Sequence, residues 1–280
     1  MRRLHVSEIR KTVAGLCIKA NVQLRPDVFN ALTRSYRTER NKRSKEILGI
    51  LVENARLAGK KKLPLCQDTG MTVVFLEVGQ DLHIAGGDLE RAVNDGVRDG
   101  YRKGYLRKSV VDDPFLRKNT RTNTPCVFHT KIARGDRLKI TVIPKGFGAE
   151  NKSAIRLFDP TESVENILRF IVDVVKKAGP NACPPFVVGV GIGETFDGSA
   201  MLAKRSLARA ISQRNRKSHI AKLERELLRR INALNIGPMG LGGKNTALGV
   251  NIETGATHIA GLPVAVNISC HATRGAEATL

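Results

Sequence analysis

The chain contains five cysteines, and three of them lie in segments that suit a ligand better than a core residue. Cys66 lies in Pro-Leu-Cys-Gln-Asp-Thr-Gly, Cys183 in Asn-Ala-Cys-Pro-Pro and Cys270 in Asn-Ile-Ser-Cys-His-Ala-Thr-Arg. Polar and helix-breaking neighbours predict loops, and loops on a scaffold can bring side chains together from distant positions. Three converging thiolates could hold a cuboidal iron–sulfur cluster by three corners and leave one iron open. An open iron is a Lewis acid that binds carboxylate and hydroxyl oxygens.

The spacing alone does not require a cluster, because the chain has no Cys-x-x-Cys pair and long intervals separate the three cysteines. The other two cysteines have apolar surroundings. Cys17 lies on the apolar face of a predicted helix and Cys126 opens an apolar strand. Both are predicted to be buried as small hydrophobic side chains.

Polar side chains elsewhere in these segments could transfer protons and bind acids. Asp68 and His258 are titratable groups of the kind that general acid–base catalysis uses. Gln67, Arg107 and Lys244 could bind carboxylates. A structural role is the competing interpretation, because a single histidine before a strand commonly satisfies local hydrogen bonds and most surface arginines bind nothing.

Two glycine-rich stretches resemble nucleotide-binding loops but depart from their patterns. Gly-Val-Gly-Ile-Gly at 189–193 has Phe196 where the dinucleotide fingerprint requires its last glycine. Pro-Met-Gly-Leu-Gly-Gly-Lys-Asn at 238–245 begins with proline and ends with asparagine, so it is not a Walker A loop. Nucleotide binding is therefore disfavoured. Tight turns remain one explanation of the glycines, and a backbone that approaches an anion is the other.

The elements that must position these residues belong to a mixed α/β (α+β) fold. We expect one domain over 1–280 with two lobes around the cluster site, a helical region at 1–60, and an α/β region at 61–280 where sheets are flanked by helices. Periodicity predicts three helices within 4–59, one at 88–105, one at 164–178, and two within 199–234 that are broken near 217. It predicts strands at 71–78, 186–190, 246–252, 257–260 and 263–268. Residues 126–132 and 137–143 are predicted to pair as a hairpin, and 107–125 to form a loop.

Composition and charge exclude some classes of protein and leave others open. The chain has 280 residues, 41% of them hydrophobic, and no stretch apolar enough for a membrane span, which predicts a folded cytoplasmic protein with reduced thiols. The net charge of +21 admits nucleic acid, an anionic membrane, an acidic protein partner or acidic small substrates. The lack of Trp and the few other aromatics disfavour a single-strand binder.

Several motifs together resemble a known family. They are Leu-Cys-Gln-Asp-Thr-Gly at 65–70, Asn-Ala-Cys-Pro-Pro at 181–185, Ile-Gly-Pro-Met-Gly-Leu-Gly-Gly-Lys-Asn-Thr-Ala at 236–247, His-Ile-Ala at 258–260 and Cys-His-Ala at 270–272. In order and spacing, over most of the chain, they are similar to the class I, iron–sulfur-dependent fumarate hydratases and the related L-tartrate dehydratases.

The resemblance implies a cofactor and roles for the site residues. It implies a 4Fe–4S cluster on Cys66, Cys183 and Cys270, whose open iron binds substrate. Asp68 would be the proton donor to the departing hydroxyl, and His258 a catalytic or orienting group. The residues that the resemblance and their chemistry assign to substrate binding are Gln67, Arg107, Gly148 and Lys244.

The resemblance also implies a reaction and a partner. The expected activity is that of a hydro-lyase, the reversible hydration of fumarate to L-malate in the tricarboxylic acid cycle, with L-tartrate dehydration as the alternative. Single-chain members continue into a second domain that supplies a catalytic threonine base. Because this chain stops ten residues after Cys270, we expect an α subunit that is active only with a β subunit, in an α2β2-type heteromer. A basic nucleic-acid-binding protein is the alternative of a different class, and it predicts no cluster.

Overall fold

A computed structural model describes residues 2–280 and divides them into two compact units. Unit 1 consists of the chain up to Arg25, Ala55–Phe147 and Arg274–Leu280, and unit 2 consists of Pro26–Asn54 and Gly148–Thr273. The predicted mixed α/β class is confirmed. The helical region at 1–60 is shared between both units, because the chain crosses from one to the other at 25/26 and at 54/55.

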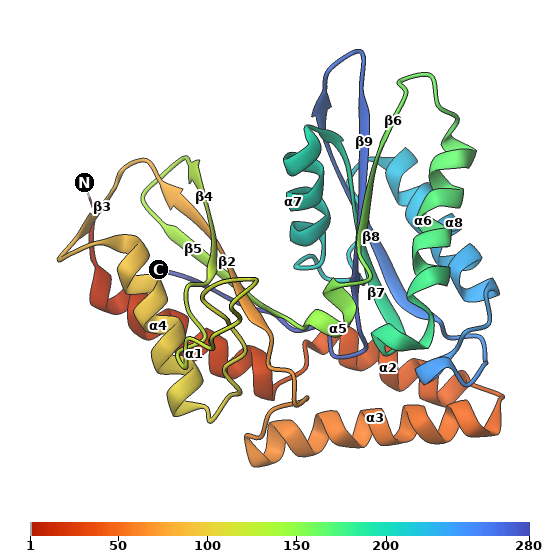
Figure 1. Cartoon of the computed structure of the whole chain (residues 1–280), viewed down its shortest axis with the longest axis horizontal. Coiled ribbons are helices and arrows are strands. Elements are labelled where there is room, and N and C mark those ends of the chain that lie inside the picture. The colour runs from red at the N-terminus through yellow and green to blue at the C-terminus, as the bar shows by residue number, and fades with distance from the viewer. Residues whose placement is uncertain (1) are drawn as a thin grey trace. The chain divides into compact units, whose positions relative to one another are not determined.

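Unit 1 is a sheet of order β10-β5-β2-β4 covered by α1 and α4 (Figure 1). Its buried core joins side chains of both helices to the apolar side chains of β2 and β5. A small parallel pair, β1 with β3, lies beside it. The bounds of its elements are β1 (Arg2–His5), α1 (Val6–Val22), β2 (Met71–Gly79), β3 (Leu82–Ala85), α4 (Leu89–Lys103), β4 (Val127–Ala133), β5 (Leu138–Lys145) and β10 (Ala276–Thr279).

The predicted hairpin between β4 and β5 is wrong. Both strands exist, but β2 lies between them, parallel to β4 and antiparallel to β5. The connecting turn closes over the end of β2: Gly79 N donates to Arg137 O at 2.8 Å, and a Cβ on Gly79 would lie 2.3 Å from Gly135 O. A turn signal shows that the chain reverses, whereas the long apolar strand β2 can pair on both edges and so separates the two strands.

Both core cysteines of unit 1 are buried, as predicted. Cys17 is fully buried on α1, where its Cβ would lie 2.9 Å from a Cβ placed on Gly100 of α4, so the glycine allows the two helices to approach closely. Burial raises the pKa of the Cys17 thiol, and it raises that of Cys126 to about 11. Thiols that resist ionisation are poor metal ligands.

Unit 2 is a sheet of order β6-β9-β7-β8 with α7 on one face and α6 and α8 on the other (Figure 1). Strand β7 is central and apolar up to its last residue, Glu194, and it pairs parallel with β8 and antiparallel with β9. The elements of unit 2, with α3 and α5 crossing its boundary, are α2 (Pro26–Thr38), α3 (Lys42–Lys61), α5 (Phe147–Glu150), β6 (Ala154–Phe158), α6 (Val164–Ala178), η1 (Gly179–Ala182), β7 (Phe186–Glu194), α7 (Phe196–Ser206), α8 (Ser218–Ala233), η2 (Pro238–Gly240), β8 (Ala247–Thr257) and β9 (Leu262–Ser269).

The glycines of 189–193 serve packing. A Cβ on Gly189 would lie 2.3 Å from Ala203 O, and one on Gly191 would lie 2.1 Å from Ser199 O. The backbone that approaches these glycines closely is therefore that of helix α7. This packing explains Gly189 and Gly191 without a bound ligand.

Two further expectations for unit 2 need correction. The predicted strand at 257–260 does not form, because β8 continues to Thr257 and the next four residues turn the chain into β9. The predicted helix pair over 199–234 is interrupted more widely than expected, by turns over 207–217. None of the helices within residues 2–280 combines the length and the apolar character needed to cross a membrane.

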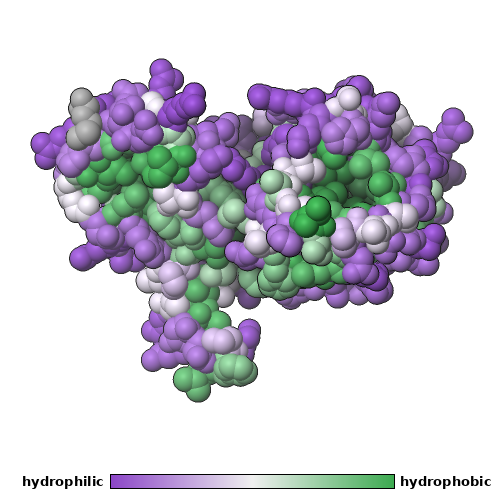
Figure 2. Space-filling view, turned by 90° about the horizontal axis from the view of Figure 1, so that it is seen from above, coloured by the Kyte–Doolittle hydropathy of each residue, from purple (hydrophilic) through white to green (hydrophobic). Residues whose placement is uncertain are grey.

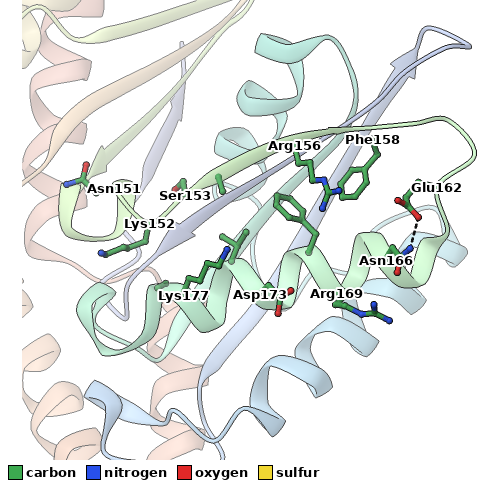
Figure 3. A pocket seen from close by; sticks show the side chains of 14 residues that line it. Asn151, Lys152, Ser153, Arg156, Phe158, Glu162, Asn166, Arg169, Asp173 and Lys177 are labelled. Atoms are coloured by element: carbon green, nitrogen blue, oxygen red, sulfur yellow. Dashed lines mark hydrogen bonds between the residues drawn. The ribbon is translucent and has the colours of Figure 1, made fainter.

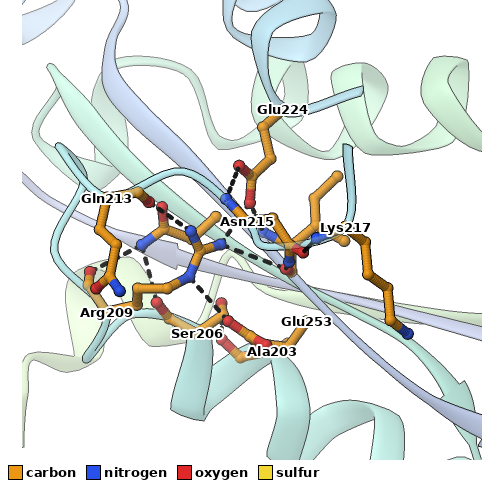
Figure 4. Close-up of polar contacts among 10 residues, drawn as sticks. Ala203, Ser206, Arg209, Gln213, Asn215, Lys217, Glu224 and Glu253 are labelled. Atoms are coloured by element: carbon orange, nitrogen blue, oxygen red, sulfur yellow. Dashed lines mark hydrogen bonds and ion pairs between the residues drawn. The ribbon is translucent and has the colours of Figure 1, made fainter. Parts of the chain in front are cut away.

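A buried ion pair holds the 207–217 segment onto β8 (Figure 4). Arg209 contacts Glu224 of α8, and its Nε donates to Glu253 at 2.8 Å. Glu224 also accepts from the backbone N–H of Ile252 at 2.8 Å and of Asn215 at 3.2 Å. The side chains of Arg209 and Glu224 are only 14% and 8% exposed, so each needs the other to compensate for lost hydration.

Replacing Arg209 by methionine should lower the free energy of unfolding by about 3 kcal/mol, because the buried carboxylate of Glu224 loses its countercharge. Urea unfolding measures the difference. The double variant Arg209→Met/Glu224→Leu should recover part of the loss. Arg229→Met, which removes an exposed partner of Glu226, should leave the urea midpoint nearly unchanged. A single Arg209 variant as stable as the wild type would show that water replaces the pair.

Candidate functional site

Unit 1 holds the loop of Cys66 against its sheet through buried hydrogen bonds. Leu65 N donates to Asn21 O at 2.8 Å, and the hydroxyl of Tyr101 donates to Thr69 O at 2.6 Å and lies 3.0 Å from Gly70 O. Gly70 has φ +79° and lies so close to β5 that a Cβ would be 2.7 Å from the backbone N of Lys145. The loop can therefore take this path only with glycine at position 70.

Asp68 lies where the start of β2 meets the end of β5. Met71 pairs with Lys145, which places Gly146 and Phe147 next to the carboxylate. Its Oδ2 accepts from Phe147 N at 2.8 Å, and its Oδ1 accepts from Gly70 N at 2.9 Å. Two backbone donors thus orient a half-buried carboxylate whose loop neighbours are Cys66 and Gln67.

Cys66 and Gln67 form the outer part of this loop. The Cys66 thiol is half-buried and donates to Gln67 Oε1 at 3.1 Å, while the Gln67 side chain is exposed. Arg107 is also exposed, and its backbone carbonyl accepts from Thr69 Oγ1 at 2.7 Å. Unit 1 thus brings Cys66, Gln67, Asp68 and the backbone of Arg107 into one neighbourhood.

Unit 2 brings Cys183 and Cys270 to the same end of its sheet. Cys183 immediately follows η1 and precedes β7, and Cys270 follows β9, whose Ser269 pairs with Val187 of β7. The backbone N–H of His271 donates to Cys183 O at 3.2 Å. Cys183 is exposed and Cys270 half-buried, so both thiols remain accessible.

The glycine-rich loop of Lys244 reaches the same end. Phe186 N donates to Thr246 O at 2.8 Å, and Met239 N donates to Pro184 O at 3.0 Å, so this loop lies beside the loop of Cys183. Gly240 has φ +80° and allows contact with Pro180, since a Cβ there would lie 2.4 Å from the proline Cβ. The side chain of Lys244 is exposed.

Glu39 accepts hydrogen bonds from the loop that carries Lys244. It is 4% exposed, and burial alone would raise the pKa of its carboxyl group. Hydrogen bonds from the Asn41 backbone, the Asn245 amide and the backbone N–H groups of Arg40 and Lys244 outweigh burial and hold the pKa below its usual value. The Asn245 amide donates to Oε2 at 2.7 Å. An ionised Glu39 therefore fixes the loop that presents Lys244.

Replacing Glu39 by glutamine should lower the free energy of unfolding by about 1 to 3 kcal/mol at pH 7, because one acceptor oxygen becomes a donor facing other donors. A carboxylate with a lowered folded-state pKa stabilises the protein above its unfolded value of about 4.3, and this contribution is lost as pH falls through the folded value. The difference in urea midpoint between wild type and Glu39→Gln should therefore shrink as pH is lowered from 7 toward the folded pKa. A constant difference would mean that Glu39 is not ionised in the folded chain.

Gly148 and His258 occupy different ends of unit 2. Gly148 is exposed on α5, whose Glu150 accepts from the Asn267 amide at 2.9 Å, three residues before Cys270. His258 is exposed in the turn between β8 and β9, where Thr257 pairs with Glu194 at the far end of β7. At about 3.3 Å per residue, β7 separates the two ends by roughly 25–30 Å. Within unit 2, His258 is thus not brought together with the cysteines, and its catalytic role stays a prediction.

The predicted cluster ligands are divided between the units, with Cys66 in unit 1 and Cys183 and Cys270 in unit 2. Within residues 2–280 the structure gathers no group of three or more His, Cys, Asp and Glu side chains as a metal site. In the part of the chain that the structure describes, none of the five cysteines forms a disulfide, and the three predicted ligands are the ones that are not buried.

Arg274 is a site residue that the sequence interpretation missed. It is 4% exposed, and its Nη1 donates to Asp68 O at 2.7 Å and to Asn21 Oδ1 at 2.9 Å. A Cβ on Gly146 would lie 3.2 Å from its Nη2, so the guanidinium also adjoins the Gly146 backbone. The available signal was an arginine four residues after Cys270 in Cys-His-Ala-Thr-Arg. Arg274 positions the Asp68 loop.

Unit 2 also contains a cavity of about 590 Å³ between β6 and α6 (Figure 3). Lys152, Arg156, Arg169 and Lys177 line it together with Glu162 and Asp173. The Arg156 guanidinium lies 4.5 Å from the ring centre of Phe158, and Glu162 accepts from the Asn166 amide at 2.7 Å. None of the predicted site residues lines this cavity.

A family profile and individual relatives both match this chain over nearly its whole length. The profile described as "Fumarate hydratase (Fumerase)" matches residues 10–279. The "Putative L(+)-tartrate dehydratase subunit alpha" of Methanocaldococcus jannaschii is 40% identical over 277 residues, which covers 96% of each chain. The L(+)-tartrate dehydratase subunit alpha of Escherichia coli K12 is 30% identical over 272 residues, covering 96% of this chain and 89% of the relative. This chain therefore belongs to the fumarate hydratase (Fumerase) family.

Proposed function

We propose that this chain is the α subunit of an iron–sulfur hydro-lyase that dehydrates L(+)-tartrate. The observation that carries the proposal is the set of three accessible cysteines in loops, with Asp68 held two residues after the first of them. The names of the similar proteins favour tartrate over malate as the substrate. They do not favour the alternative of a basic nucleic-acid-binding protein.

The chemistry of the donor set fits a 4Fe–4S cluster bound through three thiolates. Cys66, Cys183 and Cys270 are at least partly accessible. Cys183 and Cys270 directly follow η1 and β9, and Cys66 lies in the loop between α3 and β2. The buried Cys17 and Cys126 have raised pKa values and are packed in the core of unit 1. The three accessible cysteines would hold the cluster. When bound, it would supply an iron with an open position, a Lewis acid for a hydroxyl and a carboxylate of the substrate.

The protein's own groups would carry the proton. Loss of water from tartrate removes a hydroxyl from one carbon and a proton from its neighbour, which gives the enol of oxaloacetate. Protonated Asp68 would give its proton to the departing hydroxyl as a general acid, and the two backbone N–H groups that bind its oxygens would stabilise the carboxylate that remains. Arg274 would keep the Asp68 backbone fixed by its bond to Asp68 O.

Binding of the substrate's carboxylates requires positively charged side chains or amide groups that donate hydrogen bonds. Gln67, Arg107 and Lys244 are exposed and could donate hydrogen bonds to them. The backbone at Gly148 is open, since nothing lies within 4 Å of a Cβ placed there, and it could line the same pocket. His258 lies in the same unit as Cys183 and Cys270 but at the other end of its sheet, so it would orient substrate only if it came from another copy of this chain.

A partner subunit would complete the site. The relatives are named as alpha subunits, and we propose that this chain likewise acts with a β subunit, as an α2β2-type heteromer in the cytoplasm. The β subunit would provide the base that removes the carbon-bound proton. Fumarate hydration is the second candidate reaction, favoured by the family's description as fumarate hydratase.

The test is a substrate comparison on anaerobically purified chain assembled with its β subunit. Oxaloacetate formation from L(+)-tartrate should have a kcat/KM at least tenfold above fumarate formation from L-malate. The reverse order would make the enzyme a fumarate hydratase. Turnover of neither substrate by the iron-loaded complex would contradict the hydro-lyase proposal.

A further inference from the structure

We propose that the loop at 107–125 is a docking element that inserts Phe115 and Leu116 into an apolar pocket of the β subunit. The proposal rests on the proposed function, because it assumes that a second subunit exists. It names the surface of this chain that the β subunit binds and the kind of surface that the β subunit must have.

The tip of the loop exposes two large apolar side chains side by side. Phe115 is 92% exposed and Leu116 is 84% exposed, while Leu106 at the base of the same loop is 1% exposed. Figure 2 shows a narrow projection that ends in apolar surface among hydrophilic residues, at the place of this loop in Figure 1. Adjacent exposed apolar side chains on a projecting element are typical of protein interaction sites.

The tip is shaped by hydrogen bonds although its side chains contact nothing of the core. The Asp113 carboxylate accepts from Phe115 N at 2.8 Å and from Leu116 N at 2.7 Å, and Asp113 O accepts from Arg117 N at 2.9 Å. Below the tip, Asp112 N donates to Lys118 O at 2.9 Å, and Thr120 N donates to Val110 O at the same distance. A preformed tip loses little conformational freedom when it binds.

The base of the loop is joined to the loop of Cys66. The Asn123 side chain accepts from Ser109 N at 2.7 Å and donates to Gly70 O at 3.1 Å. Thr69 donates to the carbonyl of Arg107 at 2.7 Å. A subunit that bound Phe115 would therefore contact the same segment that carries Arg107.

The charge around the tip favours an acidic partner over a second copy of this chain. Arg117 and Lys118 directly follow the apolar pair in the sequence, and Lys108 and Arg121 lie in the same loop. Two carboxylates precede the pair, the exposed Asp112 and Asp113, and that of Asp113 accepts hydrogen bonds within the tip. Two copies of a chain with net charge +21 would bring like charges together at this contact. An apolar pocket rimmed by Asp and Glu matches the surface, and we assign it to the β subunit.

The experiment uses the full chain and the β-type subunit of the same organism, purified anaerobically. Phe115→Ser/Leu116→Ser should weaken the α–β complex at least tenfold in Kd, measured by biolayer interferometry, because central apolar anchors carry much of the binding energy. At saturating β subunit, kcat should return to within about twofold of wild type. The matched control is Ile132→Ser, which removes a 63% exposed apolar side chain from β4 of the same unit.

Further measurements separate the possible outcomes. Circular dichroism and iron content should be unchanged in both variants, which excludes a folding defect. Arg117→Glu/Lys118→Glu should slow association and reduce its dependence on salt. An unchanged Kd in an active complex would overturn the docking proposal and leave the proposed function intact. Self-association of the isolated chain that is lost in the double serine variant would overturn it in favour of a second copy.

Discussion

Replacing Cys183 by serine should reduce the iron bound per chain at least tenfold after anaerobic reconstitution. Serine has nearly the same size, but its hydroxyl does not ionise near neutral pH and is a poor ligand for iron. Cys183 is exposed after η1, so the substitution creates no cavity in the core. Cys66→Ser and Cys270→Ser should have the same effect, because two thiolates do not hold a cluster that needs three.

The control for this experiment is Cys126→Ala, at a buried cysteine whose pKa is raised to about 11. It should retain wild-type iron content and the broad absorption near ~400 nm of thiolate-bound iron. Full iron content in Cys183→Ser would contradict the three-cysteine site. Loss of iron in Cys126→Ala, with the fold intact by circular dichroism, would contradict the division of the cysteines into accessible ligands and core residues.

Replacing Asp68 by asparagine should lower kcat by about 10²- to 10⁴-fold, the usual effect of removing a positioned proton-transfer group. The substitution keeps the size of the side chain and retains one carbonyl oxygen for the bond from Phe147 N. Iron content, partner binding and the urea midpoint should therefore change little. Steady-state kinetics on the iron-loaded complex measures the effect.

Arg274→Lys distinguishes proton transfer from positioning. Arg274 bonds the Asp68 carbonyl and Asn21 rather than a reacting group, so it acts through the loop. Lysine keeps the charge but makes fewer fixed hydrogen bonds. The variant should lower both kcat and the urea midpoint, whereas Asp68→Asn should lower kcat and leave the urea midpoint nearly unchanged. Near wild-type kcat for Asp68→Asn would show that Asp68 is structural.

Much of the local structure follows from residues close together in the sequence. The helix at Val164–Ala178 was predicted within its observed bounds, because Ser163 caps it, with its Oγ accepting from Asn166 N at 3.2 Å, and Gly179 ends it. Burial of Cys17 and Cys126 followed from apolar neighbours in the same way. Such signals depend on hydrogen bonds and periodicity within a few residues, and the sequence contains them directly.

The errors have a common cause in pairing between distant segments. The turn at Gly135 was recognised, but β2 lies between the two strands that the turn connects. Nothing near the turn indicates this, because insertion of β2 depends on its own apolar faces and on Gly79 admitting the Gly135 backbone. Arg274 was missed for a similar reason, since its partners Asn21 and Asp68 lie far away in sequence.

The mixed α/β class and the family could be predicted from the sequence, and the structure and the comparisons confirm them. The three cysteine ligands also follow from the sequence, and they stay a prediction. These depend on residue types and short spacings. No pattern in the sequence indicated that the Cys183, Lys244 and Cys270 segments meet at one end of a sheet, or that His258 lies at the other end, and both became visible in the folded chain. Strand order and register place a residue along a sheet, and both depend on the burial of whole strand faces rather than on the residues beside it in the sequence.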